Sequence, residues 1–535
     1  MLFDANRLLT EVRIKRLSGL CGQDRRPIAE RLVAETAELA QRTVRGASLL
    51  ELADAWLPDE PSKAINYSKQ ARALVREATE PNLAALSLAI EADALLQQDP
   101  LHANEAHDLM QRAVGLARRQ RNRVNDPILR ATSMRDRIRI FEGATRAALA
   151  AGRLDSALEA AEHARPSLPE EQPLVLEAVR DAINVGELGI VYTWLDPQRL
   201  LVAVIEREGL AAVEVQVSSE ALLLLETLSA HLRNGRQDGW SFTPAEAEGL
   251  NILTPALLPP FVNSRLAHAR KLFILPHRAL HAVPFGLLRV GETRLGLRFP
   301  WTAVPNLAAV SRAFPVAAKC GLIASGIDRY PGLRSTRGFG DSAERVVAVH
   351  HAHGLPARCL ADPGAYEAFL ELAGGDELET SAFLLLACHG TSVQGDTPGE
   401  SFLQFGAKRL TADTLAAFRI PADLVVLVAC CSGQRAVGGM GIHFWPGDDL
   451  FGLQAAFWRA GARQVIGALW NADIRAASTM PSVVHDAWLN GADAAECVHA
   501  AAVRLDADAF HHRNHDWATF SAVQFGRNLQ RSKAR

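Results

Sequence analysis

A cysteine and a histidine stand at the ends of two apolar runs in the second half of the chain. The run LVVLVA at 424–429 is short and rich in valine, and it leads directly into Cys430. A similar run at 381–387 ends shortly before His389. Such runs are typical of buried strands in a parallel sheet. Ligands of open α/β sheets bind at the carboxyl ends of the strands. If the two strands are neighbours, the thiol and the imidazole therefore face one crevice.

A cysteine beside a histidine can act as a nucleophile. The imidazole lowers the pKa of the thiol, the thiolate attacks, and the protonated imidazole later donates its proton to the leaving group. A structural role is the alternative, because free cysteine is among the most frequently buried residue types. A histidine remote in the sequence, 41 residues before Cys430, is the pattern that favours catalysis.

Alternating strand and helix patterns surround these two runs. From about residue 317, apolar segments such as CGLIASG and QVIGALW are separated by segments with a helical period. This alternation predicts a parallel sheet with helices on both faces. Three earlier strand-like runs, GIVYTW, LLVAVIE and KLFILP, follow Pro173.

The first part of the chain, to about Pro169, has a different composition. It is rich in Ala, Leu, Arg and Glu and follows a helical period. Alanines seven residues apart recur on one face of the expected helices: Ala64 and Ala71, Ala106 and Ala113, Ala157 and Ala164. The third pair belongs to a helix, a turn at 152–154 and a second helix, which resembles a tetratricopeptide hairpin. The spacing between pairs is irregular, so a plain helical bundle remains an alternative.

Composition limits the class of protein. A chain of 535 residues exceeds what one hydrophobic core supports, so more than one domain is expected. The net charge of −3 gives no general attraction to nucleic acid or anionic membranes. Seven scattered cysteines indicate reduced thiols of a cytoplasmic protein rather than a disulfide framework. Neither a signal peptide nor a transmembrane run is expected.

Arginines are concentrated between Arg112 and Arg146. Ten arginines and only three acidic residues lie there, an excess that could attract an acidic partner or RNA phosphates. No aromatic or glycine-rich nucleic-acid motif is interleaved with them. A solvated helix face is therefore the preferred interpretation, and nucleic-acid binding is not expected.

Two histidine clusters could supply metal ligands. They are His350, His351 and His353, and His511, His512 and His515. Neither cluster has cysteine or carboxylate partners at ligand spacing. No metal site and no cofactor are therefore expected.

Several blocks after residue 175 together resemble the CHAT family, a caspase-like cysteine peptidase domain that commonly follows tetratricopeptide repeats. In chain order the blocks are LFILPHRALHAVPFGLL, VPNLAAV, LACHGTS with the downstream Pro398 and Ser401, LTADTLAAFRIPADLVVLVACCSG, GDDLFGLQAAFWRAGARQVIGALWNAD and WATFSAVQFG. Their order between residues 175 and 526 makes the resemblance specific.

The resemblance implies an α/β caspase-like fold, a parallel-rich sheet flanked by helices, preceded by an all-α tetratricopeptide-like domain. We expect the helical domain at 1–172, the N-terminal or pseudo-caspase part of the CHAT domain at 173–315, and its catalytic part at 316–535.

The resemblance also implies catalytic roles. His389 would be the general base and acid and Cys430 the nucleophile, with the backbone N–H groups of Gly390 and Cys430 as the oxyanion hole. The chain departs from the family pattern at Cys431, where the family usually has a polar residue. The order of Ala429 and Cys430 in the block favours Cys430 as the nucleophile. Because successive side chains of a strand point to opposite faces, Cys431 is expected to face away. By the same alternation, Cys388 should lie in the core.

Acidic residues follow the nucleophile block. Asp448 and Asp449 could line a pocket for a basic P1 side chain of the substrate. A structural role at a helix N-terminus is at least as plausible, because acidic residues there offset the helix dipole. Asp473 has a family-like position without a chemistry that the sequence reveals.

These observations predict a cytoplasmic cysteine endopeptidase that acts on a protein substrate. The helical half would bind a protein partner or restrain the protease. By resemblance, such proteins act in bacterial defence, stress or regulated proteolysis. A catalytically inactive caspase-like scaffold for protein–protein interaction is the alternative, although both residues of the dyad are present. A small-molecule hydrolase is less favoured, because no G-x-S-x-G elbow, P-loop or G-x-G-x-x-G follows a strand.

Overall fold

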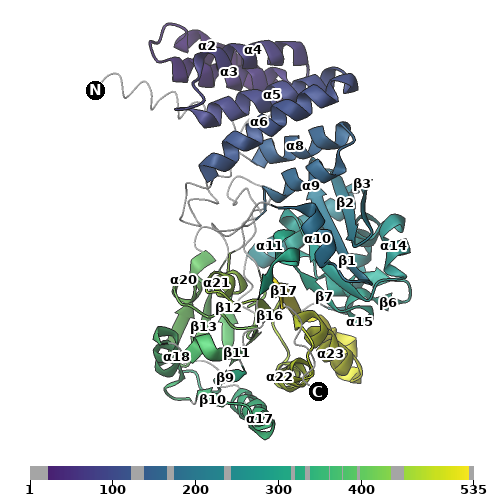
Figure 1. Ribbon diagram of the computed structural model, residues 1–535, viewed down its shortest axis with the longest axis vertical. Helices are drawn as coiled ribbons and strands as arrows, with labels where there is room; N and C mark the ends of the chain where they lie inside the picture. Colours follow the sequence, from purple (N-terminus) through teal and green to yellow (C-terminus); the bar gives the residue numbers. More distant parts are fainter. Residues whose placement is uncertain are drawn as a thin grey trace. The chain divides into compact units, whose positions relative to one another are not determined.

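A computed structural model describes ten segments of the chain (Figure 1): residues 22–121, 138–165, 174–233, 243–314, 320–331, 338–360, 362–375, 377–393, 398–434 and 451–528. The chain divides after Arg165 into two compact units. The expected domain boundaries at 172 and 315 fall outside the described residues, so these limits stay predictions.

The first unit is a stack of helices in which each helix packs against the next along the chain. In chain order the helices are α2 (Gly22–Thr36), α3 (Arg42–Trp56), α4 (Pro61–Leu74), α5 (Pro81–Gln98), α6 (Ala103–Arg121), α8 (Ile138–Ala150) and α9 (Leu154–Glu162). The all-helical character expected of this part of the chain is confirmed, whereas its assignment to the tetratricopeptide class stays a prediction.

The recurring alanines lie where these helices pack. All six are buried: Ala64, Ala71, Ala106, Ala113, Ala157 and Ala164. A residue as small as alanine lets two helix backbones approach closely, because little side chain separates them. The spacing of seven thus marks the contact faces, as the sequence predicts.

The turn predicted at 152–154 joins α8 to α9. Gly152 has a φ of +71°, a left-handed conformation that glycine adopts at little cost. The N–H of Arg153 donates to the Ala148 carbonyl at 2.8 Å, and that of Gly152 donates to the Leu149 carbonyl at 2.9 Å. This pair of hydrogen bonds is a Schellman motif, which ends α8 and sets the start of the next helix.

Two arginines of the basic stretch are engaged inside the helical unit. Arg146 donates to Asp93 at 2.9 Å, and Arg139 forms ion pairs with both Asp93 and Asp54. Arg25 on α2 also contacts Asp54, at 2.6 Å. Burial alone would raise the pKa of Asp54, but Arg139 and Arg25 lower it overall. The solvated face expected of the whole stretch is therefore wrong for these two arginines, which join α8 to α3 and α5.

The second unit is built on one large mixed sheet. In spatial order its strands are β10 (Ala357–Leu360), β9 (Gly321–Gly326), β11 (Ser381–Ala387), β15 (Leu424–Val428), β16 (Gln464–Ala468), β17 (Phe520–Gln524), β7 (Trp301–Ala303), β4 (Lys271–Leu275), β1 (Glu187–Trp194), β2 (Arg199–Glu206) and β3 (Gly209–Gln216).

Strand direction divides this sheet into two parallel blocks. The strands from β10 to β16 are mutually parallel. β17 is antiparallel to β16 but parallel to β7, with Val523 opposite Ala303. β7, β4 and β1 are parallel, and β2 and β3 close that edge as antiparallel strands. One continuous sheet therefore includes strands from both sides of the expected boundary at 315.

Helices cover both faces of the parallel block around β11 and β15. One face packs on α17 (Phe339–Ala352), α22 (Ile474–Leu489) and α23 (Ala494–Asp506) through residues such as Val346, Met480 and Val498. The other face packs on α18 (Ala365–Gly374), α20 (Ala412–Ala416) and α21 (Leu453–Arg459). Cys388 is 2% exposed on this second face, so its expected place in the core is confirmed.

The remaining helices and strands complete the unit. They include α10 (Leu176–Ala182), α11 (Ser219–Arg233), α12 (Pro244–Gly249), α13 (Thr254–Leu257), α14 (Pro260–Leu266), α15 (Leu295–Arg298), α16 (Ala308–Ser311), α19 (Glu377–Thr380), α24 (Ala509–Asn514), the hairpin β5 (Arg289–Val290) and β6 (Thr293–Arg294), and the pair β8 (Ala313–Phe314) and β18 (Arg527–Asn528). None of the described helices combines the length and apolar character needed to cross a membrane.

Candidate active site

The two predicted catalytic residues follow neighbouring strands. β11 and β15 are parallel, with Ala387 opposite Val428, and the N–H of Cys388 extends the ladder by donating to the Val428 carbonyl at 3.1 Å. His389 and Cys430 each lie two residues beyond the last paired residue of their strand. The segments after β11 and β15 therefore leave the sheet at the same level. This is the carboxyl end of the strands, where ligands bind in open α/β sheets.

His389 begins a small second sheet and contacts a tyrosine. Its strand, β12 (His389–Thr391), pairs with β13 (Phe402–Phe405), which pairs with β14 (Lys408–Thr411). The backbone N–H of His389 donates to the Tyr330 hydroxyl at 3.0 Å, and the two ring centroids are 4.3 Å apart. The Tyr330 hydroxyl donates to the Ile327 carbonyl at 2.7 Å. Tyr330 follows β9, so three adjacent strands supply this edge of the sheet.

Gly390 packs directly on the segment that carries Cys430. A Cβ atom at Gly390 would lie 2.7 Å from the Cys430 carbonyl oxygen and 2.9 Å from the Ala429 Cβ. Real Cβ atoms essentially never come so close, so only glycine fits here. The contact fixes the spacing between the chain after β11 and the chain after β15.

Hydrogen bonds join the turn after β15 to the end of β16. The Ser432 hydroxyl donates to the Ala429 carbonyl at 2.7 Å and accepts the Ala468 N–H at 3.1 Å. The N–H of Gly433 donates to the Ala468 carbonyl at 2.8 Å. A Cβ atom on Gly433 would be 2.8 Å from the Gly467 carbonyl oxygen. The backbone of the turn therefore packs directly on the backbone of β16. This contact fixes the position of the turn that carries the two cysteines.

Burial raises the pKa of the Cys430 thiol, and an N–H from Ala472 to the sulfur acts in the opposite direction. The residue still keeps part of its surface exposed. Because the ordinary pKa of a thiol already lies above neutral, the raised pKa favours the protonated thiol at neutral pH. Because only the thiolate is strongly nucleophilic, attack by Cys430 requires a base that takes the thiol proton.

Cys431 does not continue the strand as expected. β15 ends at Val428, and Cys431 has a left-handed φ of +57°, so strand alternation cannot be used to orient its side chain. Its thiol donates to Asn471 Oδ1 at 3.4 Å. Burial raises its pKa to about 12. Cys431 is thus engaged as a neutral donor, which distinguishes it from Cys430.

The turn also offers a backbone donor. The N–H groups of residues 431–434 all donate to backbone carbonyls. Within the described segments, no backbone carbonyl accepts the N–H of Cys430, although this N–H interacts with the residue's own sulfur and so opposes the rise that burial causes in the pKa of the thiol. A donor of this kind beside a nucleophile can stabilise the oxyanion that develops during acyl transfer. Its expected cooperation with the Gly390 N–H stays a prediction.

Asp448 and Asp449 lie in residues 435–450, outside the described residues, so their pocket and helix roles stay predictions. The described residues on either side of that segment are next to each other. A Cβ atom at Gly452, the N-cap of α21, would be 3.1 Å from the Gln434 carbonyl oxygen. The described residues that flank this segment therefore lie against each other beside the turn that carries Cys430.

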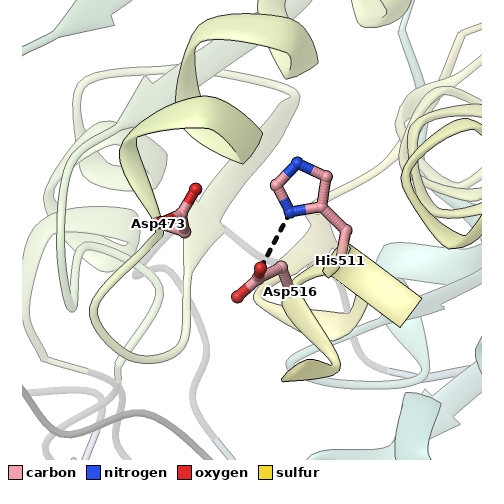
Figure 2. Close-up of side chains that lie close together, drawn as sticks. All are labelled: Asp473, His511 and Asp516. Carbon is pink, nitrogen blue, oxygen red and sulfur yellow. Dashed lines mark hydrogen bonds and ion pairs between the residues drawn. The ribbon is translucent and has the colours of Figure 1, made fainter. Parts of the chain in front are cut away.

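A second group of ionisable side chains escaped the sequence analysis: Asp473, His511 and Asp516 (Figure 2). The His511 Nδ1 lies 2.8 Å from Asp516 Oδ2. The expectation that His511 lacks carboxylate partners is therefore wrong. Asp516 comes from the 3-10 turn after α24 and Asp473 from the start of α22, and no ligand motif in the sequence joins these positions.

Comparisons with solved structures give distant similarities. The Arg-specific cysteine proteinase gingipain R, RgpB of Porphyromonas gingivalis, has 9% identity and a TM-score of 0.36 over 58% of this chain and 75% of its own. A chain of the Saccharomyces cerevisiae separase–securin complex has 10% identity and a TM-score of 0.41. That match covers 96% of this chain and 49% of the other, so this chain spans about half its length. No curated protein sequence matches the chain.

A family model described as the CHAT domain matches residues 248–527, more than half of the chain. The matched range includes β11, β15, the small sheet that begins at His389 and the turn that carries Cys430. The resemblance drawn from the sequence blocks is confirmed, and the chain belongs to the CHAT domain family.

Proposed function

We propose that this CHAT protein is a cysteine endopeptidase with Cys430 as the nucleophile and His389 as the general base and acid. The observation that carries the proposal is the register of β11 and β15, which brings both residues to the same edge of the sheet. The packing of Gly390 on the Cys430 carbonyl supports it, because the two loops are in direct contact.

The proposed reaction is acyl transfer through a thioester. His389 accepts the thiol proton while the Cys430 sulfur attacks the scissile carbonyl carbon. The carbonyl oxygen becomes an oxyanion, stabilised by the N–H groups of Cys430 and Gly390. The imidazolium then donates its proton to the leaving amine as the C–N bond breaks. Water, deprotonated by His389, hydrolyses the thioester and restores the thiol.

The segment between Gln434 and Gly452 is the proposed source of substrate selectivity. The residues that flank it, Gln434 and Gly452, lie against each other beside the Cys430 turn, and it contains Asp448 and Asp449. Two carboxylates there would favour a basic P1 side chain through charge pairing. Cleavage of matched peptides with Arg, Lys, Leu or Asp at P1 tests this assignment. Loss of the preference for Arg and Lys in the double variant Asp448→Asn/Asp449→Asn would support it.

We assign recognition to the helical unit. Stacked helices present an extended surface of the kind that binds proteins, and we propose that it binds a protein partner or restrains the peptidase in the cytoplasm. A role in bacterial defence, stress or regulated proteolysis follows from the resemblance. Mapping new protein N-termini in cells that express the wild type or Cys430→Ala would identify the substrate.

Three variants test the dyad. Cys430→Ala and His389→Ala should each lose about 10⁴-fold or more in peptide cleavage, because nucleophile and base act as one unit. Cys431→Ala should keep most of the activity, since its thiol only donates to Asn471. Peptide cleavage and labelling by an electrophilic peptide probe are measured together, with circular dichroism as the folding control.

Two results would contradict this assignment. Activity in a folded Cys430→Ala variant beside a dead, folded Cys431→Ala variant would move the nucleophile by one residue. A folded wild type that binds protein partners but reacts with no peptide probe would instead support the inactive scaffold.

A further inference from the structure

Asp473, His511 and Asp516 converge from two separate elements. Asp473 is the N-cap of α22, where its Oδ1 accepts the Arg475 N–H at 2.8 Å. His511 lies on α24, and Asp516 lies in the turn that follows. Figure 2 shows the three side chains grouped around one space between the start of α22 and this turn. One imidazole nitrogen and one oxygen from each carboxylate lie within 4.8 Å of one another.

The group holds more negative than positive charge. His511 and Asp516 are only 6% and 7% exposed, and Asp473 is half-buried. Burial disfavours an ionised carboxylate, and a second carboxylate nearby disfavours it further. One imidazole can offset at most one of the two negative charges. With the imidazole neutral, as a metal ligand must be, the charge of a divalent cation would match that of the two carboxylates.

Oδ2 of Asp473 has no hydrogen-bond partner in the described part of the chain, because the cap contact uses Oδ1. The imidazole ligand would be Nδ1 of His511, which lies on the Asp516 side of the ring and would exchange its 2.8 Å contact with Asp516 Oδ2 for the ion. Protein ligands of zinc lie about 2.0–2.2 Å from the ion, and therefore roughly 3.5 Å from one another. The candidate atoms lie within 4.8 Å of one another, so binding would draw them closer together.

We propose that Asp473, His511 and Asp516 form a binding site for a divalent transition-metal cation, Zn²⁺ or Mn²⁺. These ions accept imidazole nitrogen together with carboxylate oxygen, whereas Ca²⁺ and Mg²⁺ select oxygen ligands. Three protein ligands leave at least one coordination position for water.

The site adjoins the residues that contact both cysteines of the Cys430 turn. Asn471 Oδ1 accepts a hydrogen bond from the Cys431 thiol, and the backbone N–H of Ala472 opposes the rise that burial causes in the pKa of the Cys430 thiol. Asp473 is the next residue. A cation here would link residues 471–473 to the turn after α24. It would therefore stabilise the backbone that contacts the two cysteines.

The test measures binding directly, in tag-free protein that carries Cys430→Ala, so that this thiol cannot bind the metal. Zn²⁺ and Mn²⁺ are titrated by calorimetry, and the melting temperature is followed with and without each ion. Asp473→Asn keeps the helix cap, since asparagine caps as well as aspartate does. Asp516→Asn keeps the size of its side chain. Asp506→Asn is the matched control, because Asp506 forms an exposed pair with His512 at 2.7 Å.

We expect one equivalent of Zn²⁺ or Mn²⁺ to bind the parent and the Asp506→Asn control and to raise their melting temperatures. Affinity should fall at least tenfold in Asp473→Asn and in Asp516→Asn. If circular dichroism shows that Asp473→Asn or Asp516→Asn does not fold, His511→Gln is used in its place. Unchanged affinity in the site variants, equal loss in the control, or stabilisation by Ca²⁺ or Mg²⁺ alone would overturn the proposal. None of these results depends on peptidase activity.

Discussion

Cys430 and Cys431 are adjacent in the sequence but have different surroundings. The Cys431 thiol is committed to Asn471, and burial raises its pKa to about 12. Burial also raises the pKa of Cys430, while the Ala472 N–H on its sulfur opposes that effect. A thiolate formed at Cys430 therefore has a donor ready to stabilise it. At the scale of residues, the proposed mechanism depends on proton transfer at the moment of attack rather than on a permanent thiolate.

The raised pKa of Cys430 makes its alkylation depend on pH in a defined direction. The thiolate is the reactive form, so the rate constant with iodoacetamide should keep rising through pH 9 in the substrate-free protein. Peptide mass spectrometry in a Cys431→Ser background measures this rate for Cys430 alone. A plateau reached below pH 7 would show a preformed thiolate and contradict the protonated resting state.

The sequence predicted that His389 and Cys430 lie at one edge of the sheet, because both follow apolar strand-like runs, and the register of β11 and β15 confirms that placement. It did not predict that Tyr330 contacts His389, that Asn471 contacts Cys431 or that Asp516 contacts His511. Tyr330 follows a strand as well, so its position was an available signal. Asn471 and Asp516 come into place through turns packed across the chain, and no local pattern encodes that proximity.

At the scale of elements, a buried ion pair links the starts of β15 and β16. Arg463 Nη1 donates to Asp423 Oδ1 at 2.7 Å, and both residues are buried. Backbone bonds surround the pair, since the N–H of Arg463 donates to the Ala422 carbonyl and that of Asp423 to the Ala382 carbonyl. The pair lies at the amino ends of β15 and β16, whereas the cysteines follow the carboxyl end of β15. It therefore helps to hold these two strands in register.

Removing one partner should be more costly than removing both. Asp423→Ala leaves a buried guanidinium without its carboxylate, and we expect the free energy of unfolding to fall by about 3–5 kcal/mol. The double variant Asp423→Leu/Arg463→Met should recover much of that loss. Urea unfolding followed by fluorescence measures both changes. A double variant less stable than Asp423→Ala would contradict this account.

Strand and helix alternation predicted β9, β11, β15 and β16 as parallel strands with helices on both faces, and the structure confirms it. Two features could not be predicted in this way. The chain leaves the large sheet at His389 to form β12, and β17 lies antiparallel between β16 and β7. Both depend on pairing between distant segments, whereas apolar periodicity reports only which faces are buried.

At the scale of the whole molecule, two histidines inside the second unit link its stability to pH. His350 on α17 and His485 on α22 are both fully buried, with His350 Nδ1 3.0 Å from His485 Nε2. The Nε2 of His350 must donate to the Cys320 carbonyl at 2.7 Å, so its Nδ1 accepts from His485. Burial lowers the pKa of His485 to about 4, and positive charge on His350 and His353 acts in the same direction.

This lowered pKa means that the unfolded chain binds the extra proton more readily, so acid favours unfolding. The contribution of His485 should therefore be constant above pH 6.5, and the free energy of unfolding should fall as the pH drops from 6.5 towards 4, by up to about 3 kcal/mol. Guanidinium unfolding at pH 7.5 and pH 5.0 measures the loss. His485→Gln should reduce it, whereas the exposed His268→Gln should not. An equal loss in both variants would rule out His485 as the source.

The central position of β17 has a consequence for synthesis on the ribosome. β17 is the last strand of the large sheet in chain order, yet it lies between β16 and β7. Until residues 520–524 leave the exit tunnel, the growing chain has two separate blocks of strands with unpaired edges where they will meet. The His389 and Cys430 segments emerge well before that point. A prematurely terminated nascent chain would thus carry both residues without the completed sheet behind them, so the proposed peptidase should mature only once synthesis has passed β17.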